Sequence, residues 1–130
     1  MRYCGIDYGS KRIGIAISDP AGRIAFPKKV IFNRGNPRMR EQLKSLLEEE
    51  DISRVIVGLP LNLDGSESEE SKKVRAFAED LKKSAPLPVE FENEMLTTHM
   101  VERAGIKKEH TDEAAAALIL QSYLDKISKS

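Results

Sequence analysis

The sequence has few of the features that mark several large classes of protein. Its 130 residues contain one cysteine, Cys4, which excludes an internal disulfide framework. Aromatic residues make up 5% of the chain and hydrophobic residues 40%, so the core is expected to be aliphatic. No apolar run approaches the roughly 18 residues of a membrane-spanning helix, and the N-terminus lacks the apolar segment of a signal peptide. We therefore expect a soluble, cytoplasmic protein.

The chain also lacks an excess of charge of either sign. Lys plus Arg number 21 and Asp plus Glu number 21, so the formal net charge is zero. Any binding of nucleic acid must therefore come from a local basic face. The length fits one domain with its own core, over residues 1–130.

Several familiar motifs are absent as well. The early glycines do not form the pattern that opens a dinucleotide-binding helix, and there is no phosphate-binding P-loop. His99 and His110 lack the spacing of zinc ligands. Ser10 has no obvious histidine partner and no strand-turn-helix elbow around it, which disfavours a serine hydrolase.

The first part of the chain predicts an antiparallel meander. Strands are expected at Tyr3–Tyr8, Arg12–Ser18 and Ile24–Phe32, and the turns between them are short. A continuous apolar run at Arg54–Gly58 is typical of a strand buried on both faces, and a fifth strand is expected at Val89–Asn93.

Helices are expected between and after the later strands. Asn36 and Pro37 begin the first, and Ser66 with Glu69 forms a capping box for the second. A short helix starts at Thr97 or Thr98 and ends at Gly105; the last covers Asp112 to about Ile127, capped by Thr111. The order predicts an α/β fold: a mixed five-stranded sheet, a meander followed by parallel strands, with helices on both faces.

Asp7 is the most informative residue. It ends the first strand, Gly9 follows two positions on, and the cations Lys11 and Arg12 come next. A carboxylate beside such a turn can hold a divalent cation against a phosphate. This pattern alone is a weak signal of a metal site. It becomes more informative because the same fold could place Glu94 and Asp112 close to Asp7.

Small residues suggest how Asp112 reaches Asp7. Gly5 shares a side of its strand with Asp7, Gly14 lies on the small-residue side of the second strand, and Ala114–Ala117 give the last helix a surface equally short of bulk. Close helix-to-sheet packing would set Asp112 beside Asp7. The alternative is that the alanines are only good helix formers and Asp112 an ordinary first-turn carboxylate.

Glu94 follows the fifth strand in the alternation Glu90, Glu92, Glu94. The alternative interpretation is a solvated charge on an edge strand.

Four segments together resemble the bacterial YqgF/RuvX family of RNase H-like proteins, over nearly the whole chain. They are Gly5–Gly14, Val57–Gly65, Glu94–Thr98 and Asp112–Asp125. The resemblance implies an RNase H-like fold and a divalent-metal-dependent nuclease site. Asp7, Glu94 and Asp112 would be its catalytic residues and metal ligands, with Mg²⁺ as the ion and Mn²⁺ as a substitute.

The resemblance also implies the substrate. Family members resemble nucleases that trim the 5′ end of pre-16S rRNA, which suggests pre-ribosomal particles as partners, and they are similar to Holliday junction resolvases. Lys11, Arg12, Lys107 and Lys108 are the expected phosphate contacts.

The chain departs from the family pattern in two places. Asn93 and Met95 flank Glu94, so Glu94 lacks the basic neighbour that the family usually has, and the segment from Gly105 to Thr111 is short.

Four alternatives for the function follow: an RNA nuclease, which we favour; a resolvase of branched DNA; a sugar-kinase-like phosphotransferase, which needs two such cores; and a non-catalytic nucleic-acid-binding or ribosome-assembly module. The number of metal ions and the choice of monomer or dimer are open at this point.

Overall fold

The computed structural model describes residues 1–34, 37–93 and 111–129. Its elements are β1 (Tyr3–Tyr8), β2 (Arg12–Ser18), β3 (Ala25–Phe32), α1 (Pro37–Glu49), β4 (Arg54–Leu59), α2 (Glu69–Ser84), β5 (Val89–Asn93) and α4 (Thr111–Ser128). The expected Asn36 cap and the short helix near Thr97 lie outside the described residues. None of the described helices is long and apolar enough to cross a membrane.

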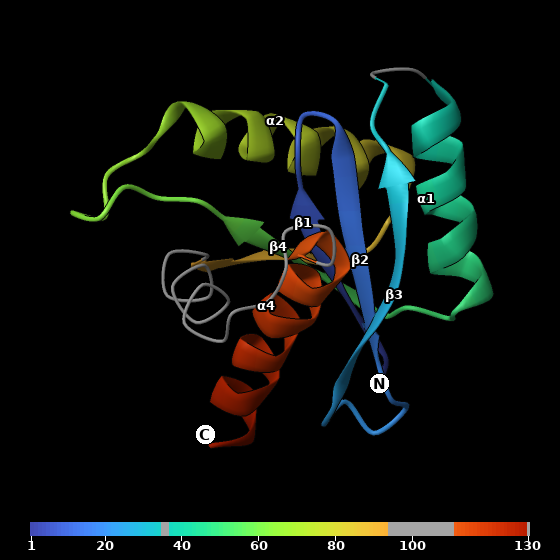
Figure 1. Cartoon of the computed structure of the whole chain (residues 1–130). Helices are drawn as coiled ribbons and strands as arrows, with labels where there is room; N and C mark the ends of the chain where they lie inside the picture. The colour runs from blue at the N-terminus through green and yellow to red at the C-terminus, as the bar shows by residue number, and fades with distance from the viewer. Residues whose placement is uncertain (35–36, 94–110, 130) are drawn as a thin grey trace.

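The five strands form one mixed sheet in the order β3-β2-β1-β4-β5 (Figure 1). β1 pairs antiparallel with β2, and β2 antiparallel with β3. β4 pairs parallel with β1, and β5 parallel with β4. The predicted meander followed by parallel strands is therefore confirmed.

Alternating side chains divide the core into two layers, one on each face of the sheet. Cys4, Ile6, Ile13 and Ile15 pack with the buried residues of α1 and α2 on one face. On the other face, Ala16 and Ile56 pack against α4 through its buried residues, Ala116, Ile119, Leu120 and Leu124. In Figure 1, α4 crosses the sheet on the face opposite α1 and α2. The face covered by α4, hereafter the α4 face, carries the candidate site.

Two local predictions are corrected by hydrogen bonds of short side chains. β3 begins at Ala25, not Ile24, because the Asp19 carboxylate accepts hydrogen bonds from the backbone N–H groups of Arg23 (2.8 Å) and Ile24 (2.9 Å) and extends the turn. These bonds to the charged form hold the pKa of Asp19 below its usual value.

The capping box of α2 was also predicted at the wrong residues. Ser68 is the N-cap and Ser71 its partner, each side chain bonding the other's backbone N–H (2.9 and 2.8 Å). Ser66 is held instead by Asp64, whose carboxylate accepts from the Ser66 N–H (2.9 Å) and hydroxyl (2.6 Å). A side chain already bonded inside the preceding loop cannot cap the helix.

Candidate functional site

Asp7 lies at the carboxyl end of β1, with its side chain on the α4 face. Its cross-strand partner in β2 is Gly14, and residues directly opposite in an antiparallel pair share a face. Gly5 gives the same result, because alternate residues of a strand share a face and a Cβ on Gly5 would meet the Cβ of Leu120 in α4 at 2.7 Å. Asp7 itself is partly buried.

Gly14 brings the first turn of α4 against the sheet. A Cβ built on Gly14 would lie 1.9 Å from the backbone oxygen of Asp112 and 2.9 Å from the backbone nitrogen of Glu113. Only a residue without a side chain permits this approach. The residue opposite Asp7 therefore touches the main chain of Asp112, and the predicted small-on-small packing is confirmed.

Arg12 and Asp112 form an ion pair that the sequence did not reveal. The Arg12 Nε lies 2.8 Å from the Asp112 Oδ2, with the side chains 54% and 26% exposed. We expected Arg12 to contact substrate phosphate and Asp112 to bind metal, and the structure joins the two. A carboxylate has several lone pairs on two oxygens, so an Asp112 bound to Arg12 keeps acceptor capacity for a cation.

The turn that carries Lys11 and Arg12 is fixed by backbone contacts. The Gly9 N–H donates to the Arg12 carbonyl (3.0 Å), and the Asn33 N–H donates to the Lys11 carbonyl (2.8 Å). The Asn33 side-chain amide donates to the Gly9 carbonyl (2.8 Å). Asn33 follows β3 directly, so the end of β3 holds the turn after Asp7 in place. The Lys11 side chain is exposed at this turn.

Both carboxylates of β5 bond to α4, but only Glu92 is buried, since the Glu90 side chain is 41% exposed. Glu92 is 4% exposed, accepts a hydrogen bond from the Ser122 hydroxyl (2.7 Å) and pairs with the Lys126 ammonium (2.9 Å). Glu90 accepts hydrogen bonds from the Tyr123 hydroxyl and from Arg54 (3.0 Å). Burial raises the pKa of Tyr123, and the bond to Glu90 raises it further.

Glu92 is also in register with Asp7, two strands away in the sheet. Ile6 is in register with Val57, and Val57 with Phe91, so the next residues of β1 and β5 are Asp7 and Glu92. With one strand between them, their backbones are roughly 9.5 Å apart. The acidic alternation in the sequence was the available signal for this buried carboxylate. Because Glu92 already has two partners, we assign it to the support of α4.

The structure thus brings together some of the predicted site residues. Asp7 and Asp112 lie on one face and meet through Gly14, with Arg12 beside Asp112. Glu94, Lys107 and Lys108 lie outside the described residues, so the three-carboxylate site stays a prediction. Within residues 1–34, 37–93 and 111–129, no three His, Cys, Asp or Glu side chains gather as a metal site. Carboxylate oxygens are nevertheless the donors that Mg²⁺ prefers.

Comparison with known proteins identifies the family of the chain. A family model described as "RuvX: Holliday junction resolvase" matches residues 1–126. A protein of Sulfurihydrogenibium sp., named "Putative pre-16S rRNA nuclease", is 38% identical over 99% of this chain and 93% of its own. A protein of the same name from Thermoanaerobacter pseudethanolicus is 40% identical over 96% of both chains.

Solved structures show the same fold. RuvC of Thermus thermophilus, in complex with a Holliday junction substrate, superposes with a TM-score of 0.65. The alignment covers 100% of this chain and 98% of RuvC, with 15% sequence identity. Because the identity is low, this likeness supports the RNase H-like fold and nothing finer.

Proposed function

We propose that this chain, which belongs to the RuvX family, is a divalent-metal-dependent nuclease that hydrolyses a phosphodiester bond at the α4 face. One observation carries the proposal: Gly14, the cross-strand partner of Asp7, touches the backbone of Asp112. Two carboxylates separated in the sequence thereby share one face at the carboxyl end of β1. The family match disfavours the phosphotransferase alternative.

Asp7 and Asp112 are the proposed metal ligands and catalytic residues, with Glu94 as the third. β1, β4 and β5 are parallel, so their carboxyl ends lie at the same edge of the sheet, and Glu94 follows β5 directly in the sequence. The oxygen-only donor set fits Mg²⁺, with Mn²⁺ as a substitute. When bound, such an ion supplies Lewis-acid stabilisation and activates water.

The other described residues of the site would position the substrate. Lys11 is exposed on the fixed turn after Asp7 and is placed to bind a phosphate oxygen. Arg12 neutralises Asp112, which reduces the repulsion between clustered carboxylates in the absence of metal. A cation bound by Asp112 would supply that neutralisation instead, and the Arg12 guanidinium would then be available to a substrate phosphate. Lys107 and Lys108 complete the proposed basic flank.

Pre-16S rRNA is the proposed substrate, with trimming of its 5′ end as the reaction. The support is the name of the relatives at 38% and 40% identity. The zero net charge also disfavours long duplex arms, since affinity for duplex DNA depends on how many phosphates are neutralised. We propose a cytoplasmic location with pre-ribosomal particles as partners, because bacterial rRNA precursors are made there.

Branched DNA is the second candidate substrate, favoured by the description of the family. A cleavage panel at matched Mg²⁺ and salt separates the two. It contains a pre-16S rRNA leader, single-stranded RNA and a four-way DNA junction. We expect cutting of the rRNA leader at enzyme concentrations that leave the junction intact. Symmetric nicking of the junction with the leader uncut would favour the resolvase.

A non-catalytic assembly module is the remaining alternative. The Asn93 and Met95 departures allow it, and the retained acids oppose it. Thermal unfolding with and without Mg²⁺ or Mn²⁺ discriminates, because an ion bound by the native state alone raises the melting temperature. No shift at millimolar metal would support the non-catalytic alternative.

A further inference from the structure

The outer strand β3 exposes an aromatic side chain near each end, on opposite faces of the sheet, with two lysines between them. Phe32 is 62% exposed and Phe26 49% exposed, in a chain with only 5% aromatic residues. Lys28 and Lys29 lie between them and are exposed as well. An exposed ring with cations nearby is typical of surfaces that bind single-stranded nucleic acid, because a base stacks on the ring and phosphates contact the cations. Phe32 is the ring of β3 that meets this description at the candidate site.

Phe32 lies next to the proposed catalytic site. It is the cross-strand partner of Arg12 in the β2–β3 ladder, so the two side chains share the α4 face. Arg12 is the residue that pairs with Asp112. The ring of Phe32 is therefore one strand away from the ion pair at the proposed metal site.

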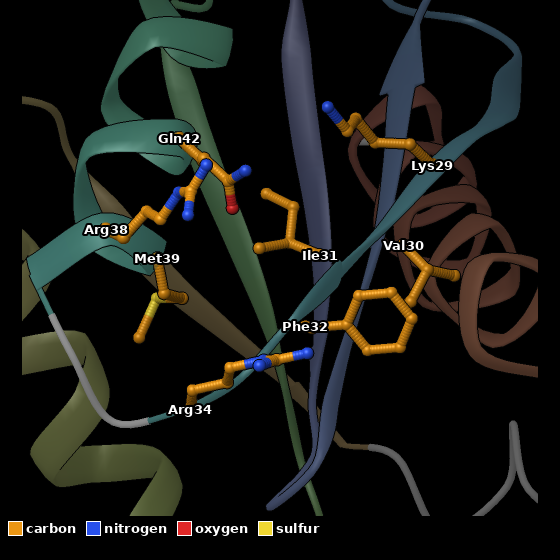
Figure 2. A pocket seen from close by; sticks show the side chains of 8 residues that line it. All are labelled: Lys29, Val30, Ile31, Phe32, Arg34, Arg38, Met39 and Gln42. Atoms are coloured by element: carbon orange, nitrogen blue, oxygen red, sulfur yellow. The ribbon is translucent and has the colours of Figure 1, made fainter.

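A pocket continues from Phe32 around the edge of the sheet to the opposite face. It holds about 360 Å³ between β3 and α1, which is within the range of small-ligand sites. Figure 2 shows its lining: residues from β3 and the segment after it on one side, and Arg38, Met39 and Gln42 from α1 on the other.

The lining of this pocket carries charge of one sign. Among the described residues, Lys29, Arg34 and Arg38 are the charged ones in its lining, and no carboxylate is among them. Within the described part of the chain none of the three has an ion pair, whereas their neighbours Lys28 and Arg40 pair with Glu50 (3.0 Å) and Asp80 (3.3 Å).

An adjoining hollow is different. It shares Lys29 and Arg38 but is also lined by Glu41, Glu49 and Glu50. Of the two hollows, the one at the Phe32 end of β3 therefore has cations in its described lining without carboxylates beside them.

We propose that this edge binds a single-stranded segment of the RNA substrate as it leaves the catalytic site. A base stacks on Phe32, and the phosphates that follow it contact Arg34, Arg38 and Lys29. The inference rests on the proposed function, because it deepens the assignment of the same site. Pro27 and the two lysines of β3 disfavour pairing of this edge with the strand of a second copy.

Binding can be measured without cleavage. The full chain in EDTA is titrated against a fluorescent single-stranded RNA of roughly 12 nucleotides, and anisotropy is read. We expect Phe32→Ala to weaken binding by about fivefold or more, which is the low end for loss of one stacked base. Phe32→Tyr retains an aromatic ring and should keep the affinity close to that of the wild type. Phe26→Ala removes the other exposed ring of β3 and should stay within about twofold of the wild type.

The cations are tested by the salt dependence of the same binding. The double variant Arg34→Ala, Arg38→Ala should lower the slope of log K against log salt by about 1.4, or roughly 0.7 for each lost contact on a single strand. Arg40→Ala is the matched control on α1, because Arg40 is already paired, and it should leave the slope unchanged. These side chains are exposed, so thermal unfolding should confirm that each variant is folded.

Two outcomes would overturn the inference. In the first, Phe32→Ala and the double arginine variant bind like the wild type. In the second, duplex RNA binds more tightly than the single strand and is equally sensitive to the arginines, which would assign the surface to a duplex backbone. Failure of the proposed function is distinguishable: RNA would bind with the expected pattern of variants, but Mg²⁺ would produce no cleavage.

Discussion

Gly14→Ala tests how the two carboxylates are held together. The new Cβ would lie 1.9 Å from the Asp112 backbone oxygen, whereas real Cβ contacts essentially never fall below 3.0 Å. The first turn of α4 must therefore move away from β2 by about 1 Å or more, the difference between those two distances. Because the clashing atoms belong to the backbone, no side-chain rotation relieves the contact.

The magnitudes follow from this displacement. Overpacking of this kind costs about 1–3 kcal/mol of folding free energy. For 130 residues each kcal/mol lowers the melting temperature by about 4 °C. A displacement of about 1 Å at a catalytic group can cost about 100-fold in rate. We expect Gly14→Ala to fold at 25 °C, to melt about 4–12 °C lower and to lose about 100-fold in Mg²⁺-dependent cleavage.

Gly5→Ala is the matched control. Its Cβ would meet the Leu120 Cβ at 2.7 Å and the Ala116 backbone oxygen at 2.8 Å, so α4 needs only a small shift farther along the helix. Cleavage of a labelled rRNA leader and thermal unfolding are measured for both variants. We expect Gly5→Ala to retain more activity and a higher melting temperature than Gly14→Ala. Wild-type cleavage by a folded Gly14→Ala protein would refute the reasoning.

Three further predictions concern Arg12, Lys126 and Cys4. Arg12→Gln removes the partner of Asp112. The free energy of unfolding of the metal-free protein should fall by less than about 1 kcal/mol, because the ion pair is partly exposed. Mn²⁺ should bind more tightly in a calorimetric titration, and weaker binding would contradict the assignment of Asp112 as a metal ligand. Lys126→Ala removes the charged partner of the buried Glu92 and should lower the free energy of unfolding by about 1.5–3 kcal/mol in urea; an unchanged midpoint would show that Ser122 alone suffices. Burial raises the pKa of the Cys4 thiol to about 12 from 9.0, with the Glu50 charge as a smaller cause. The stability that the buried, neutral thiol contributes is therefore fully present below pH 9. It is lost as the pH rises from 9 toward 12, by up to about 1.4 kcal/mol per pH unit relative to Cys4→Ala, and parallel pH profiles of unfolding free energy for the two proteins would refute this.

Much of the fold follows from local patterns in the sequence. β1, β2 and β5 have the predicted bounds because their apolar residues alternate cleanly and turn residues flank them. The errors fall where a side chain competes for backbone hydrogen bonds. Asp19 delays the start of β3, and Asp64 holds Ser66 within the loop before α2.

The candidate site was predictable in part. Gly14 and the alanines of α4 indicated a close helix-to-sheet approach, and this brought Asp112 to the face of Asp7. The Arg12–Asp112 pair was not predictable, because it joins residues 100 positions apart through the packing of α4. The burial of Glu92 was missed for a similar reason: its partners Ser122 and Lys126 belong to α4, and a charged strand residue is usually exposed.

Cleavage of a 5′-labelled pre-16S rRNA leader by the wild type and by Asp7→Asn tests the central claim most directly. Both purified proteins are compared in Mg²⁺ and in EDTA, with thermal unfolding as the check on folding. The account predicts discrete, Mg²⁺-dependent cleavage by the wild type and none by a folded Asp7→Asn protein. Mg²⁺-dependent cleavage that survives in Asp7→Asn at the wild-type rate would contradict it.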